Sequence, residues 1–287
     1  MISGFTIVRN AVRLDYPIVP AIRSILDICD EVVVNVGRSD DDTRDLVRSV
    51  GDPRVRILDT EWDFGQHSRM LAIETQRAMD ACRGRWGIYI QADEVLHEHG
   101  ARVLKERIAA WDADERVEGL LVRYRHFWGN FDTLATARRY YRREVRCVRL
   151  GRDVRSFQDA QGFRVGSALR KIRARLTEAE MFHYGWARPA WAIGAKHQVS
   201  GEIFPWSRER SAVAQVRGTL GWMPLLRPFG GAHPRAVQEW IAARRLEAMP
   251  ALEPRRFRLG FVRYYLSDWI ERLTGARVFE FRNYVEV

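Results

Sequence analysis

The sequence predicts an α/β fold with a mostly parallel central sheet and helices on both faces. Two observations support this class. Short β-branched and aromatic runs alternate with segments whose apolar residues recur at helical spacing, which is the β-α-β order of a parallel sheet. The runs are also apolar throughout, as expected for strands buried on both faces. These runs are residues 4–8, 31–36, 55–58 and 86–90.

Helices are expected between these strands. Asp15 and Pro17 begin a helix that reaches Cys29, because an N-cap residue followed by an early proline is a common helix start. A short helix follows the second strand, and a third, over residues 69–83, is expected to be capped by Ser68. The resulting order, β-α-β-α-β-α-β, calls for helices on both faces of the sheet.

In the remainder of the chain, the alternation typical of strands gives way to helical patterns near residues 181–189. Before this change we expect a helix over 101–111, strands over 117–125 and 179–184, and between them an irregular, Arg-rich stretch from 131 to 175 that contains a strand near 145–150. After it, segments 236–249 and 259–273 have amphipathic helical patterns. We therefore expect a catalytic domain over residues 1–190 and a helical C-terminal extension over residues 191–287 packed on it.

Composition excludes several classes of protein. Three widely spaced cysteines among 287 residues argue against a disulfide framework and lack zinc-site spacing, so a reducing cytoplasm is expected. No apolar run is long enough for a transmembrane helix. The net charge is +10, and residues 123–175 alone hold 15 basic and 4 acidic side chains, a difference of +11. Such a region indicates an anionic partner, although a coding bias toward Arg is an alternative.

The strand at residues 86–90 ends in the sequence Gln91-Ala92-Asp93-Glu94. Ligands of open α/β sheets bind beyond the carboxyl ends of the strands, where these two carboxylates lie. A carboxylate there can hold a divalent cation, and the cation can hold a phosphate. The alternative is a polar turn with two solvated acids.

Four features in order resemble a glycosyltransferase of the GT-A fold, within the broad family-2 group. A first strand ends in Arg9-Asn10, and a second runs into an acidic, Ser-containing turn. A Gly-containing loop then leads into a helix at Arg69, and an aromatic strand ends in the Asp-x-Asp-like sequence at Gln91. The resemblance covers about the first 185 residues. It departs from the family pattern at Gln91 and Asn35, where the family usually has acids.

The resemblance implies a Mg²⁺ or Mn²⁺ ion that assists departure of the nucleoside diphosphate. Asp93 is the expected ligand of this ion, since it is the position whose carboxylate the family's metal needs most. His183, on a late apolar strand, would complete the site as a late histidine does in several GT-A enzymes. A buried, hydrogen-bonded histidine is the alternative. Gln91 can add a hydrogen bond but no charge.

The donor implied by the resemblance is a nucleotide-diphosphate sugar, lying over the ends of the first two strands. Asn35 would contact the ribose or base, with Ser39 and Asp40 shaping the loop beside it. Arg9 and Arg69 are candidates for the diphosphate, because a guanidinium matches phosphate oxygens. A solvated or salt-bridged side chain is the alternative for each arginine.

Inverting members of the family use a carboxylate to take the proton of the acceptor hydroxyl. Asp159 is the preferred candidate, because it follows the signature and a connecting strand. Glu94 is a second candidate that either faces the acceptor or only caps the following helix. The other acids of the basic segment are Asp132, Glu144 and Asp153. The expected acceptor is a polysaccharide, a lipid-linked saccharide or a similar molecule.

Two other functions remain open from the sequence. A nucleotidyltransferase would usually show a Gly-rich basic loop after the first strand, which this chain lacks. A non-catalytic basic protein that binds glycan or nucleic acid gains weight from the basic segment, but no RNA-recognition motif is present. Trp240, Tyr264, Tyr265 and Trp269 lie among arginines in the C-terminal helices. They indicate either peripheral contact with an anionic membrane at its inner face or an ordinary packing face.

Overall fold

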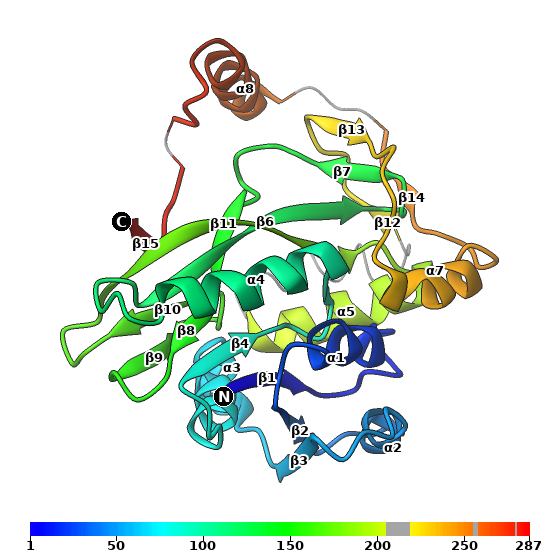
Figure 1. The fold of residues 1–287 in the computed structure, drawn as a ribbon. Helices are drawn as coiled ribbons and strands as arrows, with labels where there is room; N and C mark the ends of the chain where they lie inside the picture. Colours follow the sequence, from blue (N-terminus) through cyan, green and yellow to red (C-terminus); the bar gives the residue numbers. More distant parts are fainter. Residues whose placement is uncertain (205–218, 255–257, 279) are drawn as a thin grey trace.

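We describe the protein from a computed structural model, which places residues 1–204, 219–254, 258–278 and 280–287. The first half contains ten elements in β-α order (Figure 1). They are β1 (Ile2–Val8), α1 (Ile18–Leu26), β2 (Glu31–Gly37), α2 (Thr43–Arg48), β3 (Val55–Thr60), η1 (Phe64–Gln66), α3 (Arg69–Asp80), β4 (Trp86–Tyr89), β5 (Glu94–Leu96) and α4 (Glu98–Trp111).

The second half is richer in strands. Its described elements are β6 (Gly119–Trp128), β7 (Thr133–Ala135), β8 (Arg143–Arg149), β9 (Val154–Phe157), β10 (Gly162–Val165), β11 (Arg170–Trp186), α5 (Ala190–Ile203), β12 (Thr219–Leu220), β13 (Leu226–Pro228), η3 (Arg235–Val237), α7 (Gln238–Arg244), β14 (Ala251–Leu252), η4 (Leu259–Phe261), α8 (Val262–Thr274) and β15 (Tyr284–Glu286).

The predicted α/β class is confirmed. The main path of the large sheet is β3-β2-β1-β4-β8-β6-β11-β10-β9. Its first four strands are parallel, with Phe5 of β1 opposite Val33 of β2 and Tyr89 of β4. Strand β8 enters antiparallel to both β4 and β6, and β6 and β11 are parallel to each other. The sheet is therefore parallel where the sequence showed β-α repeats and mixed beyond them.

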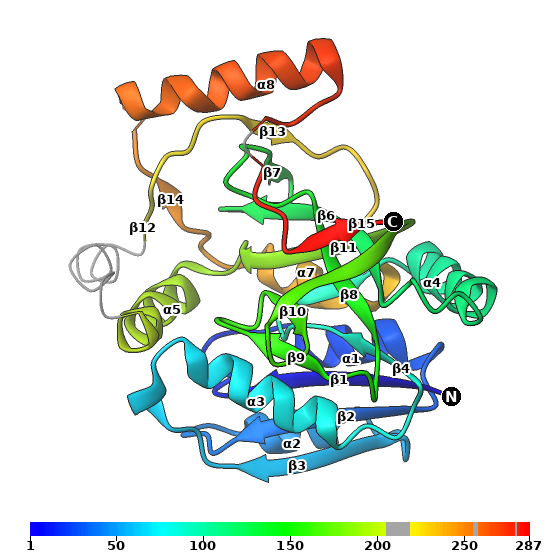
Figure 2. The ribbon, with the colours of Figure 1, turned by 90° about the vertical axis from the view of Figure 1, so that its left-hand side faces the viewer.

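Helices cover both faces of the sheet, as predicted. One apolar core joins α1, α2 and α4 to the sheet through side chains such as Ile22, Val47 and Leu104. On the other face, Met79 of α3 packs with Phe5, Tyr89 and Phe163, so α3 and the β9–β10 hairpin share a second core. Figure 2 shows α3 in front of β1 and β2, with α1 behind them.

The expectation of an irregular stretch over residues 131–175 was wrong. That stretch forms β7, β8, β9, β10 and the start of β11; it contributes β8 to the middle of the sheet and β10 and β9 to one edge. Its arginines are paired with acids from distant parts of the chain. Arg170 and Arg173 both bind Glu118, and Arg143 binds Glu286. Much of the positive charge that indicated an anionic partner is thus neutralised within the fold.

The capping contacts at two helix starts differ from those expected. Helix α1 begins at Ile18, and Asp15 instead binds Arg244 of α7 with Nη2–Oδ1 2.6 Å. Helix α3 begins at Arg69 as expected, but the Ser68 side chain forms no capping hydrogen bond. Capping signals in the sequence therefore marked helix starts without identifying the contacts of the side chains.

The C-terminal extension is more closely joined to the sheet than the expected helical appendage. Strand β13 pairs with β7, and β15 pairs with β11 so that Tyr284 lies opposite Ile172. The expected boundary at residue 190 falls inside α5, which begins at Ala190. None of the helices in the described ranges combines the length and apolar character needed to cross a membrane.

Candidate active site

A cavity of about 170 Å³ lies where β1 and β4 end. Arg9 and Asn10 follow β1, and Gln91 and Asp93 follow β4. The cavity is also lined by Asp159 and by residues of α5. Figure 2 shows α5 on the side of the sheet toward which β1 runs. The expectation that ligand-binding groups gather beyond the carboxyl ends of the parallel strands therefore has a physical counterpart in this cavity.

Asp93 lies at the centre of a cluster of cations. Its side chain is only 11% exposed, and Oδ2 is 3.3 Å from Lys196 Nζ and 3.5 Å from an Arg188 guanidinium nitrogen. Burial acts to raise the pKa of Asp93, but the charges of Lys196, His183 and Arg188 outweigh burial and hold that pKa below its usual value. Asp93 is therefore an ionised carboxylate at neutral pH. Its Oδ1 faces His183 Nε2 at 3.8 Å.

The hydrogen bonds of two histidines fix which nitrogen of His183 carries the proton. His126 Nε2 is 2.9 Å from the main-chain oxygen of Tyr141, which can only accept, so this nitrogen must carry hydrogen. Burial lowers the pKa of His126 to about 3, so its Nδ1 is an acceptor. His183 Nδ1, 3.1 Å away, must donate to it.

The consequence is that His183 Nε2 presents a lone pair toward Asp93. Burial lowers the pKa of His183 to about 4, despite the opposing charge of Asp93, so the ring is neutral at pH 7. A lone pair and a carboxylate oxygen repel each other unless a cation lies between them. Metal-binding histidines usually donate their other ring nitrogen to a neighbour, as His183 does to His126. The donor set formed by Asp93 and His183 therefore fits a divalent cation.

Backbone geometry brings these two donors together. Tyr184 N donates to Asp93 O at 2.8 Å, and β5 pairs with β11 so that His183 lies opposite Glu94. Between His183 and Trp186 the register of β11 against β6 shifts, which is a β-bulge of the kind that redirects side chains. A Cβ at Gly185 would lie 2.6 Å from His183 Nε2 and 3.0 Å from Asp93 Oδ2. Only glycine leaves this space open.

Lys196 and Arg188 add positive charge beside the donor pair. Both donate to the main-chain oxygen of Gly185, with Lys196 Nζ at 2.8 Å and Arg188 Nη2 at 2.6 Å. Burial and the neighbouring Arg188 lower the pKa of Lys196 to about 7, although Asp93 acts in the opposite direction. Arg188 Nε is buried without a hydrogen-bond acceptor among the described residues. An anion bound beside Lys196 would favour its charged form.

The structure corrects the catalytic role considered for Glu94. This side chain is completely buried and forms a bidentate pair with Arg146, with Nε–Oε2 3.0 Å and Nη2–Oε1 2.8 Å. Tyr124 Oη and Gln91 N donate to the same two oxygens. Glu94 is fully occupied and has no route to an acceptor. It instead fixes the turn that holds Asp93.

Arg146 extends this buried network to the loop that carries Asp159. Its guanidinium lies between the rings of Tyr89 and Tyr124, at 5.3 and 5.2 Å from their centres, and Nη1 donates to Gln161 O at 2.8 Å. Arg146 therefore connects the turn at Glu94 to the loop around Asp159.

We expect Arg146→Met to lower the free energy of unfolding by about 3–5 kcal/mol, because it leaves Glu94 charged and unpaired in the core. Urea denaturation followed by circular dichroism measures this loss. The double variant Arg146→Met/Glu94→Gln should recover part of the stability, since the unpaired charge is then gone. Equal stability of Arg146→Met and the wild type would contradict the structural role.

Asp159 lies in the cavity, as its proposed role requires. The residues on either side, Gln158 and Ala160, have positive φ angles of 54° and 59°, so the loop turns sharply around it. Gln91 Nε2 is 3.4 Å from Ala160 O, which holds this loop against the end of β4. Within the part of the chain that the structure describes, the Asp159 carboxylate accepts one hydrogen bond, from Gln161 N at 3.4 Å. The structure thus brings Asp159 and Asp93 to one cavity.

The structure also corrects the role of Asn35. Asn35 is fully buried beneath α3, where its Nδ2 donates to the main-chain oxygen and the carboxylate of Glu74, both at 2.9 Å. Its Oδ1 accepts from the Thr60 hydroxyl. The amide is therefore fully used inside the fold and cannot contact a ribose or a base.

Ser39 and Asp40 shape the loop beside β1, where both side chains form hydrogen bonds within the protein. Ser39 Oγ accepts from Asn10 N at 3.0 Å and donates to Gly37 O at 2.8 Å. Asp40 N donates to Asn10 Oδ1 at 2.9 Å, and its carboxylate binds Arg9 and Asn10. Asn10 itself has a positive φ of 52°. These contacts hold the loop that carries Arg9.

The two arginines expected at the diphosphate lie in different places. Arg9 lines the cavity, where its guanidinium packs 4.8 Å from the centre of the Phe64 ring and binds Asp40. Arg69 is exposed at the start of α3 and lines a separate groove between α3 and β9. Arg69 is thus not among the residues that line the cavity with Asp93.

The sequence analysis missed Arg188, Lys196, His126 and Gly185. One signal was present for Lys196: the chain has only three lysines against its many arginines, so a lysine in the segment after the last strand was distinctive. Gly185 and Arg188 follow His183 closely in sequence and could have been considered with it. Nothing in the sequence indicated His126, because its role depends on the pairing of β6 with β11.

No protein-family model matches the sequence, and no curated protein is similar to it. Solved structures do resemble it in fold. A fragment of TarS from S. aureus, residues 1–349, has 12% sequence identity and a TM-score of 0.41, covering 76% of this chain and 71% of the fragment. The longer TarS chain has the same identity and TM-score, and the match spans 43% of its length.

Glucosyl-3-phosphoglycerate synthase from Mycobacterium tuberculosis is also similar. Its complex with Mn²⁺, uridine diphosphate and phosphoglyceric acid has 19% identity and a TM-score of 0.31, with 44% of this chain and 43% of that chain covered. TM-scores of this size are too low for the likeness to indicate a function. The function is therefore argued below from the cavity itself.

Proposed function

We propose that the protein is a glycosyltransferase that moves a sugar from a nucleotide-diphosphate donor to a saccharide or lipid-linked acceptor. The observation that carries the proposal is the opposition of His183 Nε2 and Asp93 Oδ1 beside a cavity that Asp93 and Asp159 both line. A divalent-cation donor pair, flanking cations and a separate carboxylate are the groups that this reaction requires. The proposed reaction inverts the configuration of the sugar.

The proposed donor lies between the end of β1 and the loop after β4. Arg9, Trp62 and Phe64 line one side of the cavity, and they offer a cation and two aromatic surfaces for a nucleoside. Gln91 lines the cavity as well and can form a hydrogen bond without adding charge. This placement retains Arg9 and Gln91 as donor-binding residues.

The diphosphate of the donor would lie beside Asp93. Asp93 and His183 would hold a Mg²⁺ or Mn²⁺ ion, and that ion would neutralise negative charge on the leaving diphosphate. No cluster of three or more His, Cys, Asp or Glu side chains occurs in the described ranges, so other ligands of the ion would come from the donor and water. Lys196 would bind a phosphate oxygen, and the buried guanidinium of Arg188 would add positive charge behind Asp93.

Asp159 is the proposed general base. An acceptor hydroxyl that enters the cavity would transfer its proton to the Asp159 carboxylate as the oxygen attacks the anomeric carbon. The carboxylate is held by a loop that Arg146 and Gln91 anchor, so its position is defined before the acceptor binds. The bond from the anomeric carbon to the diphosphate oxygen breaks, and its electrons leave on the diphosphate.

Calorimetric titration of UDP and of GDP, each with and without Mn²⁺, tests the proposal. We expect one of the nucleotides to bind more tightly by at least tenfold when Mn²⁺ is present. In Gly185→Ala the added methyl group would displace His183 or Asp93, so the effect of Mn²⁺ should be lost. Gly221→Ala is the matched control, because a Cβ at Gly221 meets nothing within 4 Å. Failure of every nucleotide diphosphate to bind, with or without the ion, would contradict a nucleotide-sugar donor.

A further inference from the structure

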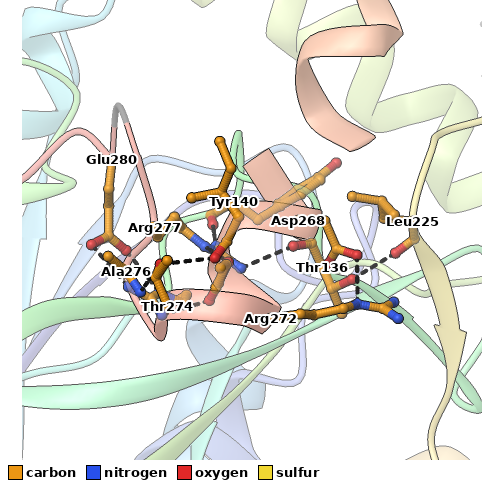
Figure 3. A network of polar contacts seen from close by, with 12 residues as sticks. Thr136, Tyr140, Leu225, Asp268, Arg272, Thr274, Ala276, Arg277 and Glu280 are labelled. Atoms are coloured by element: carbon orange, nitrogen blue, oxygen red, sulfur yellow. Dashed lines mark hydrogen bonds and ion pairs between the residues drawn. The ribbon is translucent and has the colours of Figure 1, made fainter. Parts of the chain in front are cut away.

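Helix α8 packs on the protein with its polar side inward. Asp268 binds Arg227 of β13 at 2.5 Å, and Glu271 binds Arg142 of the segment before β8 at 2.6 Å. Arg277, just after the helix, binds Glu271 and donates to the main-chain oxygens of Tyr140 and Thr136 at 3.1 Å (Figure 3). The helix is therefore attached to the sheet by ion pairs and hydrogen bonds, which is unusual for an amphipathic surface helix.

The outward side of α8 is apolar. Leu266, Trp269 and Leu273 are 54%, 61% and 67% exposed, and Val262 is exposed beside them. These four positions follow the spacing 4-3-4, so they form one stripe along the helix. Leu259, just before the helix, is 83% exposed and extends the stripe. We call these five residues the α8 stripe. Figures 1 and 2 both place α8 at the outside of the molecule, beyond β13.

Charge is segregated across the same helix. Its two acids, Asp268 and Glu271, face the protein with side chains 16% and 21% exposed. Arg258, Arg263 and Arg272 are exposed around the stripe. Arg272 keeps its pair with Asp268 at 2.9 Å while most of its side chain faces outward (Figure 3). The outer surface of α8 thus combines leucine and tryptophan with basic residues.

We propose that α8 docks the protein on an anionic lipid bilayer surface, with the α8 stripe inserted into the headgroup region. Helices that lie in the plane of a membrane interface typically expose leucine and tryptophan beside basic residues such as arginine. Anionic headgroups complement the outward arginines, whereas a partner surface of ordinary mixed charge does not. Tryptophan prefers this interface because one part of its ring is apolar and the other can donate a hydrogen bond.

This proposal changes which aromatic residues face the membrane. Trp240, considered with the others from the sequence, packs in the core with Phe131 and Tyr184. Tyr264 is half-buried, with its ring 5.0 Å from the guanidinium of Arg263. Trp269 is the aromatic residue at the centre of the stripe. The surface is independent of the cavity that holds Asp93, so docking does not rest on the proposed reaction.

Vesicle flotation tests the proposal with the full-length chain. We expect the wild type to bind vesicles of phosphatidylcholine mixed with phosphatidylglycerol, and to bind vesicles of phosphatidylcholine alone much less. Leu266→Gln/Trp269→Gln/Leu273→Gln should lower affinity for the anionic vesicles at least tenfold, because it removes the apolar area that inserts. Arg258→Gln/Arg263→Gln should weaken binding and reduce its dependence on salt.

Leu246→Gln is the matched control, since Leu246 is 90% exposed but lies outside the α8 stripe. Melting curves of all variants should coincide with that of the wild type, because every substituted side chain is exposed. Absence of wild-type binding to anionic vesicles would overturn the proposal, as would undiminished binding by the triple variant. Light scattering that shows a dimer converted to a monomer by the triple variant, without loss of vesicle binding, would assign the stripe to a second copy of the chain instead.

Discussion

Asp93→Asn is expected to abolish the effect of Mn²⁺ on nucleotide-diphosphate binding and to slow release of the nucleoside diphosphate from a bound nucleotide sugar by about a hundredfold or more. The amide keeps the shape of the side chain but loses the charge that faces His183 Nε2 and Lys196. Loss of one main electrostatic stabiliser of a leaving group costs a rate factor of about this size. Calorimetry with Mn²⁺ and a single-turnover assay of nucleoside-diphosphate release, with the nucleotide that binds in the titrations, measure the two effects.

The structure adds a stability effect that the sequence did not indicate. Asp93 is buried and balances Lys196 and Arg188, so Asp93→Asn leaves two cations without their partner. We expect the free energy of unfolding to fall by about 3 kcal/mol.

A compensated variant separates the two effects of this substitution. Asp93→Asn/Lys196→Met removes one of the unpaired cations, so it should regain stability without regaining the response to Mn²⁺. Melting curves and the same titrations measure both quantities. Unchanged Mn²⁺ dependence in a normally folded Asp93→Asn would exclude Asp93 as a ligand of the ion, and the reaction would then have to proceed without it.

The first four strands could be predicted because their signal is local. In β2, five of seven residues are β-branched or glycine and all seven are buried, so composition alone identifies a strand inside a parallel sheet. Strands β8 and β11 were predicted only in part, over residues 145–150 and 179–184, whereas β8 begins at Arg143 and β11 at Arg170. Arginines interrupt their apolar pattern, and each is accommodated only because an acid far away in the sequence meets it, as Glu94 meets Arg146.

Contacts between residues that are far apart in the sequence also limit what can be predicted of the candidate site. Asp93 and Asp159 follow a strand or a turn, and a position after a strand end is enough to place them near the cavity. Whether a polar side chain is open to that cavity depends on which other side chains pack over that polar side chain. Asn35 also lies near a strand end, but Glu74 of α3 covers it. Lys196 reaches Asp93 across 103 positions of sequence, which periodicity and spacing cannot show.

Asp159→Asn is expected to remove transfer to the acceptor while leaving the affinity for the donor unchanged. Asparagine cannot take a proton from the acceptor hydroxyl, and loss of a general base lowers the rate by about 10²–10⁴. Its oxygen can still accept the hydrogen bond from Gln161 N, so the loop should keep its conformation and the protein its stability.

The acceptor need not be known to measure this effect. Calorimetry gives donor affinity, and transfer of label to a membrane and polysaccharide extract, from a radioactive sugar of the nucleotide that binds, gives the rate. Asp153→Asn is the matched control: Asp153 belongs to the same segment, but it pairs with Arg155 and lines the groove between α3 and β9. Because Asp153 lies outside the cavity, its substitution should leave transfer intact. Retention of most transfer by Asp159→Asn would remove it from the mechanism, and Glu94 could not replace it, because Arg146 and Tyr124 occupy both of its oxygens.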